Sequence, residues 1–226
     1  GLRRARSLLS YLATRGIPSA TELLDPIVPQ YIADLISWTA IGARTTESQT
    51  HREMASGLSM PIGFKNGTDG SFNTAINAMQ SASKSHHFLG VNGNGMASIV
   101  NTTGNPDGHI VLRGGSKGPN FESHHVKRIS SELTQFSLPH KVMIDCSHGN
   151  SNKDFRKQSD VLRNVATQIA NGEKNILGVM LESHLKEGNQ KLLKREDLEF
   201  GRSITDACID IETTKELLAI LYNSIV

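Results

Sequence analysis

The chain has 226 residues, of which 37% are hydrophobic and 20% are charged, and its formal net charge is +2. These values are ordinary for a globular protein, and so small a charge gives no reason to expect a nucleic-acid partner. The sequence has no run of about 18 apolar residues, so it predicts no membrane span. Cys146 and Cys208 lie too far apart in sequence to indicate a disulfide framework, which favours a cytoplasmic location.

Short apolar strands alternate with longer helical patterns along the chain. An amphipathic helix comes first, with Leu2, Leu8, Leu9 and Leu12 on one face. In chain order the sequence then predicts strand Ser19–Leu23 and helix Pro29–Ile36, strand Trp38–Gly42 and helix Glu47–Leu58, strand Pro61–Phe64 and helix Phe72–Ser83, strand His109–Leu112 and helix Ser123–Phe136, strand Lys141–Asp145 and helix Lys153–Ala170, and strand Ile176–Leu181 and helix Thr213–Asn223.

This alternation predicts an α/β fold with a parallel sheet, because a parallel connection needs a crossover that is usually helical. Six strand–helix units behind an opening helix are what remains of a (β/α)8 TIM barrel that lacks its first strand–helix unit and its second strand. We therefore expect residues 1–226 to form one partial barrel domain. An open doubly wound sheet is the alternative, although no G-x-G-x-x-G follows the first strand to support dinucleotide binding.

A long connection between two of the predicted strands contains a further element. Residues His86–Val91 and Met96–Thr102 are apolar segments joined by Asn92-Gly93-Asn94-Gly95. Asn-Gly between two such runs is a strong hairpin signal, so we expect an inserted β-hairpin over residues 86–102. It would serve as a regulatory or interface surface, or as a surface hairpin without further function.

Three successive predicted strands are followed by cations. Arg44 follows the second strand, Lys65 the third and Arg113 the fourth, and glycine-containing turns come after the last two. Residues just beyond the strands of a barrel face its active site. One such cation would be an ordinary surface residue, but three at equivalent positions predict a site for a phosphate or a carboxylate.

The last strands are followed by possible metal ligands. His148 and Glu182 come just after two strands, and Asp206 precedes the final helix. Histidine with two carboxylates suits a divalent ion such as Mn, Fe, Co or Zn. Taken alone, His148 would be a hydrogen-bonded structural residue and Asp206 a helix N-cap. Cys146 could be a ligand, but a small buried residue is the simpler interpretation.

These strand-end segments together resemble the class I DAHP synthases (3-deoxy-7-phosphoheptulonate synthases), in the same order along the whole chain. Residues Thr50–Pro61 look more like the tyrosine-sensitive members than the phenylalanine-sensitive ones. The resemblance implies condensation of phosphoenolpyruvate with D-erythrose 4-phosphate and water, which gives 3-deoxy-D-arabino-heptulosonate 7-phosphate and phosphate at the first step of the shikimate pathway to chorismate. The segments are Ile41–Ser48, Gly63–Gly70, Leu112–Gly115, Ile144–Asn150 and Ser203–Cys208.

The resemblance also assigns substrate-binding residues. It implies that Arg44, Lys65 and Arg113 bind phosphoenolpyruvate. Glu22 and the backbone of Ala43 would lie near its phosphate. Lys65 would in addition donate or accept a proton near the reacting carbons.

For the metal, the resemblance implies that His148, Glu182 and Asp206 are three of four ligands, with His148 also counted as catalytic. The ion would polarise the aldehyde oxygen of erythrose 4-phosphate as a Lewis acid. The resemblance also implies a homo-oligomer that is inhibited by an aromatic amino acid. The likeness to the tyrosine-sensitive members favours tyrosine as that inhibitor. The expected effector residues are Gln30, Leu58, Ser59, Phe88 and Val100.

Two segments of the family have no counterpart in these 226 residues. One is the Gly-Pro-Cys-Ser segment, which carries the fourth metal ligand. The other is a Lys-Pro-Arg-Thr loop, which supplies much of the erythrose 4-phosphate site. A partial sequence of a complete enzyme is favoured over a truncated gene product, because the chain does not start with methionine. Alternative functions are an inactive chain that acts as a regulatory or binding partner, and another phosphoenolpyruvate-condensing sugar-phosphate synthase.

Overall fold

The computed structural model describes residues 1–92 and 94–225 and separates into two compact units. The first unit comprises Gly1–Val111 and Leu133–His140, and the second comprises Leu112–Glu132 and Lys141–Val226. Both units contain parallel strands connected through helices. The expected α/β class with parallel strands is therefore confirmed.

Four strands pair in parallel within the first unit. The order is β1 (Ala20–Glu22), β2 (Trp38–Ile41), β3 (Ile62–Lys65) and β6 (Gly108–Leu112), with Lys65 opposite Val111 at the carboxyl end. Most residues of β2, β3 and β6 are buried. Burial of both faces explains why these strands read as continuous apolar runs rather than as alternating patterns.

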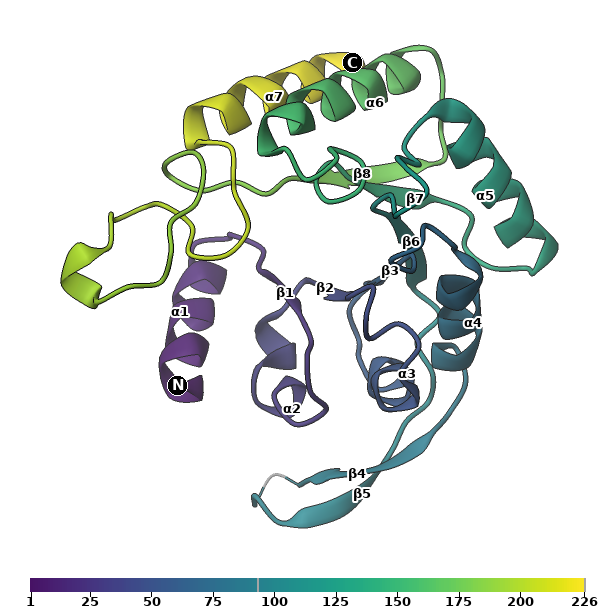
Figure 1. The fold of residues 1–226 in the computed structure, drawn as a ribbon. Coiled ribbons are helices and arrows are strands. Elements are labelled where there is room, and N and C mark those ends of the chain that lie inside the picture. Colours follow the sequence, from purple (N-terminus) through teal and green to yellow (C-terminus); the bar gives the residue numbers. More distant parts are fainter. Residues whose placement is uncertain (93, 226) are drawn as a thin grey trace. The chain divides into compact units, whose positions relative to one another are not determined.

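The helices of the first unit lie alongside these strands. They are α1 (Leu2–Thr14), α2 (Pro29–Ile32), α3 (Gln49–Ser56) and α4 (Asn73–Ala82), and Figure 1 shows α2 and α3 on the same side of β1 and β2. The helical stretch predicted around residues 29–36 is present but divided, because α2 ends at Ile32 and the 3-10 helix η1 (Ala33–Leu35) follows. Ile32 leaves helical geometry with φ −133° while its side chain packs with Ile36 and Met60, so packing overrides the local pattern.

The predicted hairpin is present as β4 (His87–Val91) and β5 (Ala97–Asn101), paired antiparallel. Within its predicted turn, Gly93 lies outside the described residues. One face of the hairpin is exposed, with the cross-strand pair Leu89 and Ile99 at 72% and 70% exposure. On α2, Gln30 Oε1 accepts a hydrogen bond from Val91 N at 2.9 Å, so the hairpin is linked to α2.

The second unit contains a parallel pair of strands and three longer helices. The strands are β7 (Val142–Asp145) and β8 (Ile176–Met180), with a register irregularity after Val142. The helix α5 (Ser123–Gln135) ends in the first unit, while α6 (Gln158–Ala170) and α7 (Ile211–Ile225) pack side by side (Figure 1). In the described part of the chain, no helix is both long enough and apolar enough to cross a bilayer.

Two helix boundaries in the second unit differ from those predicted. The pattern placed a helix start at Lys153, but Lys153 has a left-handed φ of 62°, and the chain passes through the 3-10 helix η2 (Phe155–Lys157) before α6 begins. Helix α7 begins two residues before the predicted Thr213, because Asp210 Oδ1 accepts a hydrogen bond from Thr213 N at 2.8 Å and caps the helix. The remaining short 3-10 helix is η3 (Arg195–Asp197).

A buried histidine sits in the sheet of the first unit. His109 in β6 is 4% exposed, and its Nε2 accepts a hydrogen bond from Trp38 Nε1 at 3.1 Å. Burial lowers the pKa of His109 to about 4, although a hydrogen bond with the backbone of Asp107 raises it slightly. The folded chain therefore keeps this imidazole neutral at pH values where an unfolded chain would protonate it.

We expect His109 to make the protein less stable in mild acid. Its folded pKa of about 4 lies below the ordinary histidine pKa of 6.5, so the unfolded state binds more protons between these values and stability falls as pH decreases. From pH 7 to pH 5 the loss is about 2 kcal/mol. Urea unfolding at both pH values measures it, and His109→Gln, which keeps an acceptor for Trp38 but does not titrate, should lose less. Equal losses in both proteins would contradict this assignment.

Candidate functional site

The loop after β7 leaves the strand through a tight turn. Asp145, the last residue of β7, is fully buried, and its Oδ1 accepts a hydrogen bond from Ser147 N at 2.9 Å. His148 has a left-handed φ of 54°, which is uncommon for a residue other than glycine. In this conformation His148 Nδ1 lies 2.9 Å from Asp145 Oδ2. A histidine whose Nδ1 faces a carboxylate presents its Nε2 to a ligand or metal.

The loop after β8 carries Glu182, whose backbone is held from behind by Gln158. The side chain of Gln158 is fully buried at the start of α6. Its Oε1 accepts a hydrogen bond from Glu182 N at 2.8 Å, and its Nε2 donates one to Glu182 O at 3.1 Å. This two-point contact fixes the direction in which Glu182 leaves the strand end.

Burial raises the pKa of the Glu182 carboxyl above its ordinary value. The charge of His148 and a hydrogen bond with Ser147 oppose this rise, while Asp206 and Asp145 add to it. Several carboxylates therefore share a partly desolvated region, where ionising all of them costs free energy unless a cation is present. A bound divalent ion would supply that positive charge.

Asp206 reaches the same region from the loop before α7. Its alternative interpretation as a helix N-cap is wrong, because Asp210 caps α7. The loop is anchored beside Glu182 by the hydrogen bond from Ile209 N to Glu182 O at 3.0 Å, and by the one from His184 N to Ile209 O at 3.0 Å. Asp206 itself is exposed, so water or a ligand can reach its carboxylate.

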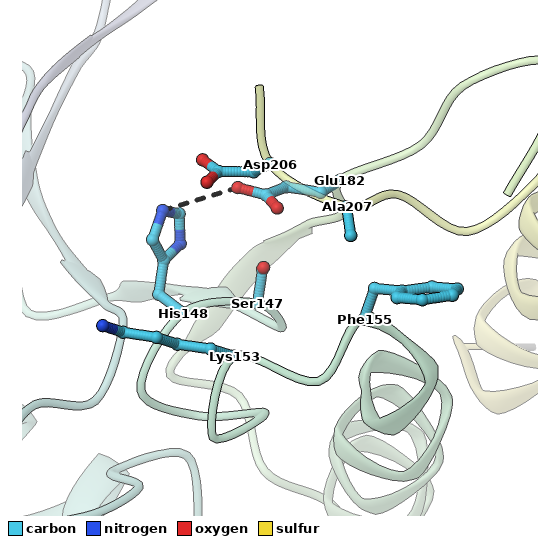
Figure 2. Close-up of a pocket in the computed structure, with 7 residues that line it drawn as sticks. All are labelled: Ser147, His148, Lys153, Phe155, Glu182, Asp206 and Ala207. Atoms are coloured by element: carbon cyan, nitrogen blue, oxygen red, sulfur yellow. Dashed lines mark ion pairs between the residues drawn. The ribbon is translucent and has the colours of Figure 1, made fainter. Parts of the chain in front are cut away.

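The three predicted metal ligands converge. His148, Glu182 and Asp206 each offer one ligand atom, and these atoms all lie within 4.8 Å of one another. His148 Nε2 is 3.4 Å from Glu182 Oε1. Figure 2 shows the three side chains pointing toward one another. One imidazole and two carboxylates are donors that a borderline divalent ion accepts, and the residues present therefore fit such an ion. The three residues line one pocket (Figure 2), whose full lining is Ser147, His148, Lys153, Phe155, Glu182, Asp206 and Ala207.

Neither cysteine has the properties of a reactive or ligating thiol. Cys146 is fully buried, and burial together with the charge of Asp145 raises the pKa of its thiol. Cys208 is also buried, and burial is the main cause of its raised pKa. Since the thiolate is the metal-binding form, the interpretation of Cys146 as a small buried residue is favoured.

The loop with Arg113 lies in the second unit, directly after β6. Arg113 is half-buried, and its carbonyl oxygen accepts a hydrogen bond from Asn150 N at 3.2 Å, in the loop of His148. Gly114 follows with a left-handed φ of 68°, and Gly115 and Gly118 exchange backbone hydrogen bonds of 3.0 Å. The loop therefore turns sharply beside the one that carries His148.

The other predicted substrate-binding residues lie in the first unit, at the carboxyl ends of its strands. Glu22 ends β1, and Lys65 ends β3. A Cβ on Gly42 would come 2.1 Å from Glu22 Oε1, so the carboxyl of Glu22 covers the backbone next to Ala43. Thr46 ties the neighbouring loop and strand together, since its buried Oγ1 lies 2.8 Å from Gly42 O and 3.0 Å from Lys65 O.

Arg44, between Ala43 and Thr46, is exposed at this same edge. The first unit therefore brings Glu22, Ala43, Arg44 and Lys65 to one end of its strands, while Arg113 shares the second unit with the metal-ligand cluster.

The expected effector residues all lie in the first unit. Gln30 contacts the hairpin through Val91, and Phe88 is the cross-strand partner of Val100 on its half-buried face. Leu58 packs against the Ile32, Ile36 and Met60 cluster, whereas Ser59 is exposed.

Sequence reasoning did not find the residues that hold or line the second-unit site from behind. These are Asp145, Lys153, Phe155 and the buried amides Asn120, Asn150 and Gln158. Asn150 closes the segment Asp145–Asn150 and could have been suspected there. Gln158 has no local signal, because its partner Glu182 lies 24 residues away in sequence. The backbone N–H of Asn120 likewise bonds Asn150, which lies 30 residues away.

Comparison with known proteins points to the same family that the sequence resembles. A model of the DAHP synthetase I family matches residues 2–219. The chain is 54% identical over 226 residues to the Tyr-sensitive phospho-2-dehydro-3-deoxyheptonate aldolase of Escherichia coli (strain K12). That match covers all of this chain and 63% of the relative. The chain is 57% identical over 225 residues to the Phe-sensitive enzyme of the same strain and covers 64% of it.

Among solved structures, the phospho-2-dehydro-3-deoxyheptonate aldolase from Francisella tularensis SCHU S4 matches with a TM-score of 0.95 and 51% identity. The match covers 99% of this chain and 65% of that one, so the chain spans less than two thirds of the length of these relatives. With a family match over nearly all of its residues, the chain belongs to the DAHP synthetase I family.

Proposed function

We propose that the protein carrying this chain joins phosphoenolpyruvate to D-erythrose 4-phosphate and water, forming 3-deoxy-D-arabino-heptulosonate 7-phosphate and phosphate. The observation that carries this proposal is the convergence of His148, Glu182 and Asp206 in a member of this family. The relatives above, named as phospho-2-dehydro-3-deoxyheptonate aldolases, support the same reaction. The product is the entry compound of aromatic amino acid biosynthesis.

For the fold, we propose that residues 1–226 form one catalytic domain, a (β/α)8 barrel without its first strand–helix unit and second strand. Strands β2, β3, β6, β7 and β8 are each followed by a helix before the next barrel strand or the chain end. The functional side chains follow the strands, as in the active sites of barrels. Residues 86–102 would be an insertion in this domain.

The metal would be held by His148, Glu182 and Asp206, with Asp145 behind His148. The ion would be Mn, Fe, Co or Zn, and when bound it supplies a Lewis acid for the aldehyde oxygen of erythrose 4-phosphate. Three protein donors leave positions for a further ligand and for substrate. Ser147 and Lys153, which line the same pocket, would contact a bound substrate directly.

Phosphoenolpyruvate would be bound through its two anionic groups. Arg44, Lys65 and Arg113 provide the positive charge, and arginine can pair with a phosphate or carboxylate through two parallel hydrogen bonds. Holding the substrate in this way directs its C3 toward the aldehyde carbon and turns an encounter of two molecules into a positioned reaction. Glu22 and the Ala43 backbone would lie near the phosphate.

The proton transfers of the reaction need a group beside the reacting carbons. The C3–C1 bond forms, and water adds at C2 as one of its protons passes to the former aldehyde oxygen. The C2–O bond to phosphate then breaks as C2 becomes a carbonyl, and the leaving phosphate takes the remaining proton. We assign Lys65 as the proton donor or acceptor, because it ends β3 at the same edge as Glu22 and Arg44.

We expect His148→Ala to weaken binding of Mn²⁺, used alone as a probe, by more than about 100-fold, since changes behind a metal ligand already cost about 10–100-fold. Calorimetric titration measures the affinity. His184→Ala is the matched control, because His184 is an exposed histidine two residues from Glu182 and outside the cluster. Unchanged Mn²⁺ affinity in His148→Ala would exclude this ligand assignment.

We expect Arg113→Ala to raise the KM for phosphoenolpyruvate on the order of 100-fold, because truncating one partner of a charged contact costs about 2–5 kcal/mol. Phosphate release is followed with Mn²⁺, phosphoenolpyruvate and erythrose 4-phosphate. Arg163→Ala, an exposed arginine on α6, should behave as wild type. Replacing erythrose 4-phosphate by arabinose 5-phosphate tests the substrate, and a preference for arabinose 5-phosphate would contradict the proposed function.

For regulation, we propose a homo-oligomeric enzyme in the cytoplasm that is inhibited by tyrosine. The relatives named Tyr-sensitive and Phe-sensitive support an aromatic effector, and their identities of 54% and 57% to this chain are similar. The proposed effector residues are Gln30, Leu58, Ser59, Phe88 and Val100, and the contact of Gln30 with the hairpin supports a site at α2 and β4.

We expect Gln30→Ala to reduce inhibition by tyrosine at least about fivefold, because allosteric coupling of 1 kcal/mol corresponds to about that factor and the variant removes the side-chain acceptor of Val91 N. Inhibition curves with tyrosine and with phenylalanine measure the effect and the choice of effector. Gln135→Ala, an exposed glutamine at the end of α5, is the control. Stronger inhibition by phenylalanine would overturn the tyrosine assignment.

A further inference from the structure

We propose that Asn150 is a positioning residue that couples the loop of Arg113 to the loop of His148. One buried amide would then set both the anion-binding and the metal-binding parts of the second-unit site. The inference rests on the proposed function for the roles of Arg113 and His148, and it adds a residue that touches neither ligand.

The side chain of Asn150 joins three backbone segments. It is 3% exposed, and its Nδ2 donates hydrogen bonds to Leu112 O at 3.0 Å and to Asp145 O at 2.8 Å. Its Oδ1 accepts a hydrogen bond from Asn120 N at 2.8 Å. Leu112 and Asp145 both lie in the second unit and directly precede the two loops, so this one amide holds the backbone where each loop begins.

The metal side of the coupling passes through Asp145. Asn150 holds the carbonyl of this residue, while its carboxyl lies 2.9 Å from His148 Nδ1. The backbone N–H of Asn150 is shared between Ser147 O at 3.1 Å and Arg113 O at 3.2 Å. Movement of Asn150 would therefore alter the turn that keeps His148 in its left-handed conformation.

The anion side passes through Asn120. This residue is 7% exposed, and its Oδ1 accepts a hydrogen bond from Gly114 N at 2.7 Å while its own N–H donates to Asn150. The side chain of Asn120 therefore fixes the peptide directly after Arg113, and Asn150 in turn holds the backbone of Asn120. Two amides in series position the Arg113 loop.

The two loops are also in direct backbone contact. A Cβ on Gly114 would come 2.5 Å from the carbonyl carbon of Gly149, and a Cβ on Gly149 would come 2.5 Å from Gly115 N. Such distances leave no room for any side chain. Because no side chain separates the two loops, their relative position depends on the hydrogen bonds that Asn150 makes to both.

Removing the Asn150 amide should affect both loops. Asn150→Ala leaves Leu112 O, Asp145 O and Asn120 N without this partner in a buried region, and groups left in that way cost free energy. They would move to find water or new partners, and Arg113 and His148 would move with them. Asn150→Asp keeps the size and the acceptor but places an oxygen against the two carbonyl oxygens.

The same unit offers a matched comparison. Gln158 is an equally buried amide that bonds the backbone of Glu182 alone in both directions. Gln158→Ala should disturb the metal ligands without disturbing the Arg113 loop. Asn120→Ala should do the opposite, because it removes the acceptor of Gly114 N.

The test measures the affinity for Mn²⁺ and the affinity for phosphoenolpyruvate separately, in the whole protein that contains this 226-residue chain. Mn²⁺ alone probes the metal ligands, and phosphoenolpyruvate in the presence of EDTA probes the anion site, both by calorimetric titration. We expect Asn150→Ala and Asn150→Asp to weaken both affinities on the order of 10-fold, the scale of changes behind a metal ligand. Gln158→Ala should weaken only Mn²⁺ binding, and Asn120→Ala only phosphoenolpyruvate binding.

The outcomes separate a positioning role from a structural one. Thermal unfolding of each variant by circular dichroism gives Tm, and lowered Tm with both affinities at their wild-type values would overturn the coupling. So would an effect of both Asn150 variants on one ligand only. If Asn150→Ala does not fold, the isosteric Asn150→Asp decides on the same criteria. Wild-type protein that bound neither probe would overturn the proposed function together with the coupling.

Discussion

The loop after β7 has to turn immediately beyond a strand end that is closed to water. Asp145 is fully buried at that point, so its polar groups must find partners within the protein. They find them in Ser147 N and Asn150 Nδ2. Satisfying those groups over so short a stretch requires the left-handed backbone of His148 and, at Gly149, a residue without a side chain, because the backbone of Gly114 and Gly115 lies against it. The position of the His148 imidazole follows from this local hydrogen-bonding requirement.

The charges of the site follow from the same geometry. A turn that buries Asp145 behind His148 places one carboxylate near the imidazole, and Glu182 and Asp206 bring two more. Without a cation these groups repel one another, which is part of why the pKa of Glu182 is raised, although burial contributes more. A cation that entered this region would relieve the repulsion between the carboxylates.

The sequence was sufficient for the strands and for the side chains that follow them. Each predicted barrel strand lies within one or two residues of the observed one, because buried parallel strands leave continuous apolar runs. His148 and Glu182 were singled out because they follow such runs, and they lie together with Asp206. Arg113 was singled out for the same reason, and its role stays a prediction. Helix boundaries were less predictable. The break after Ile32 and the late start of α6 depend on packing and on left-handed loop residues, which no periodic pattern records.

The buried amides behind the site could not be predicted from the sequence, and one physical property explains both this and their position. Asn120, Asn150 and Gln158 are neutral amides, and each carries a donor and an acceptor on one small group. Such a side chain can satisfy buried backbone groups in two directions without adding a charge behind the ligands. A buried Asp, Glu or Lys in the same place would cost desolvation energy and would shift the pKa of Glu182 further. The charged side chains therefore line the pocket, while buried amides hold the loops behind it. Because Asn and Gln are also common at protein surfaces, the sequence alone does not distinguish a loop-holding amide from a surface one.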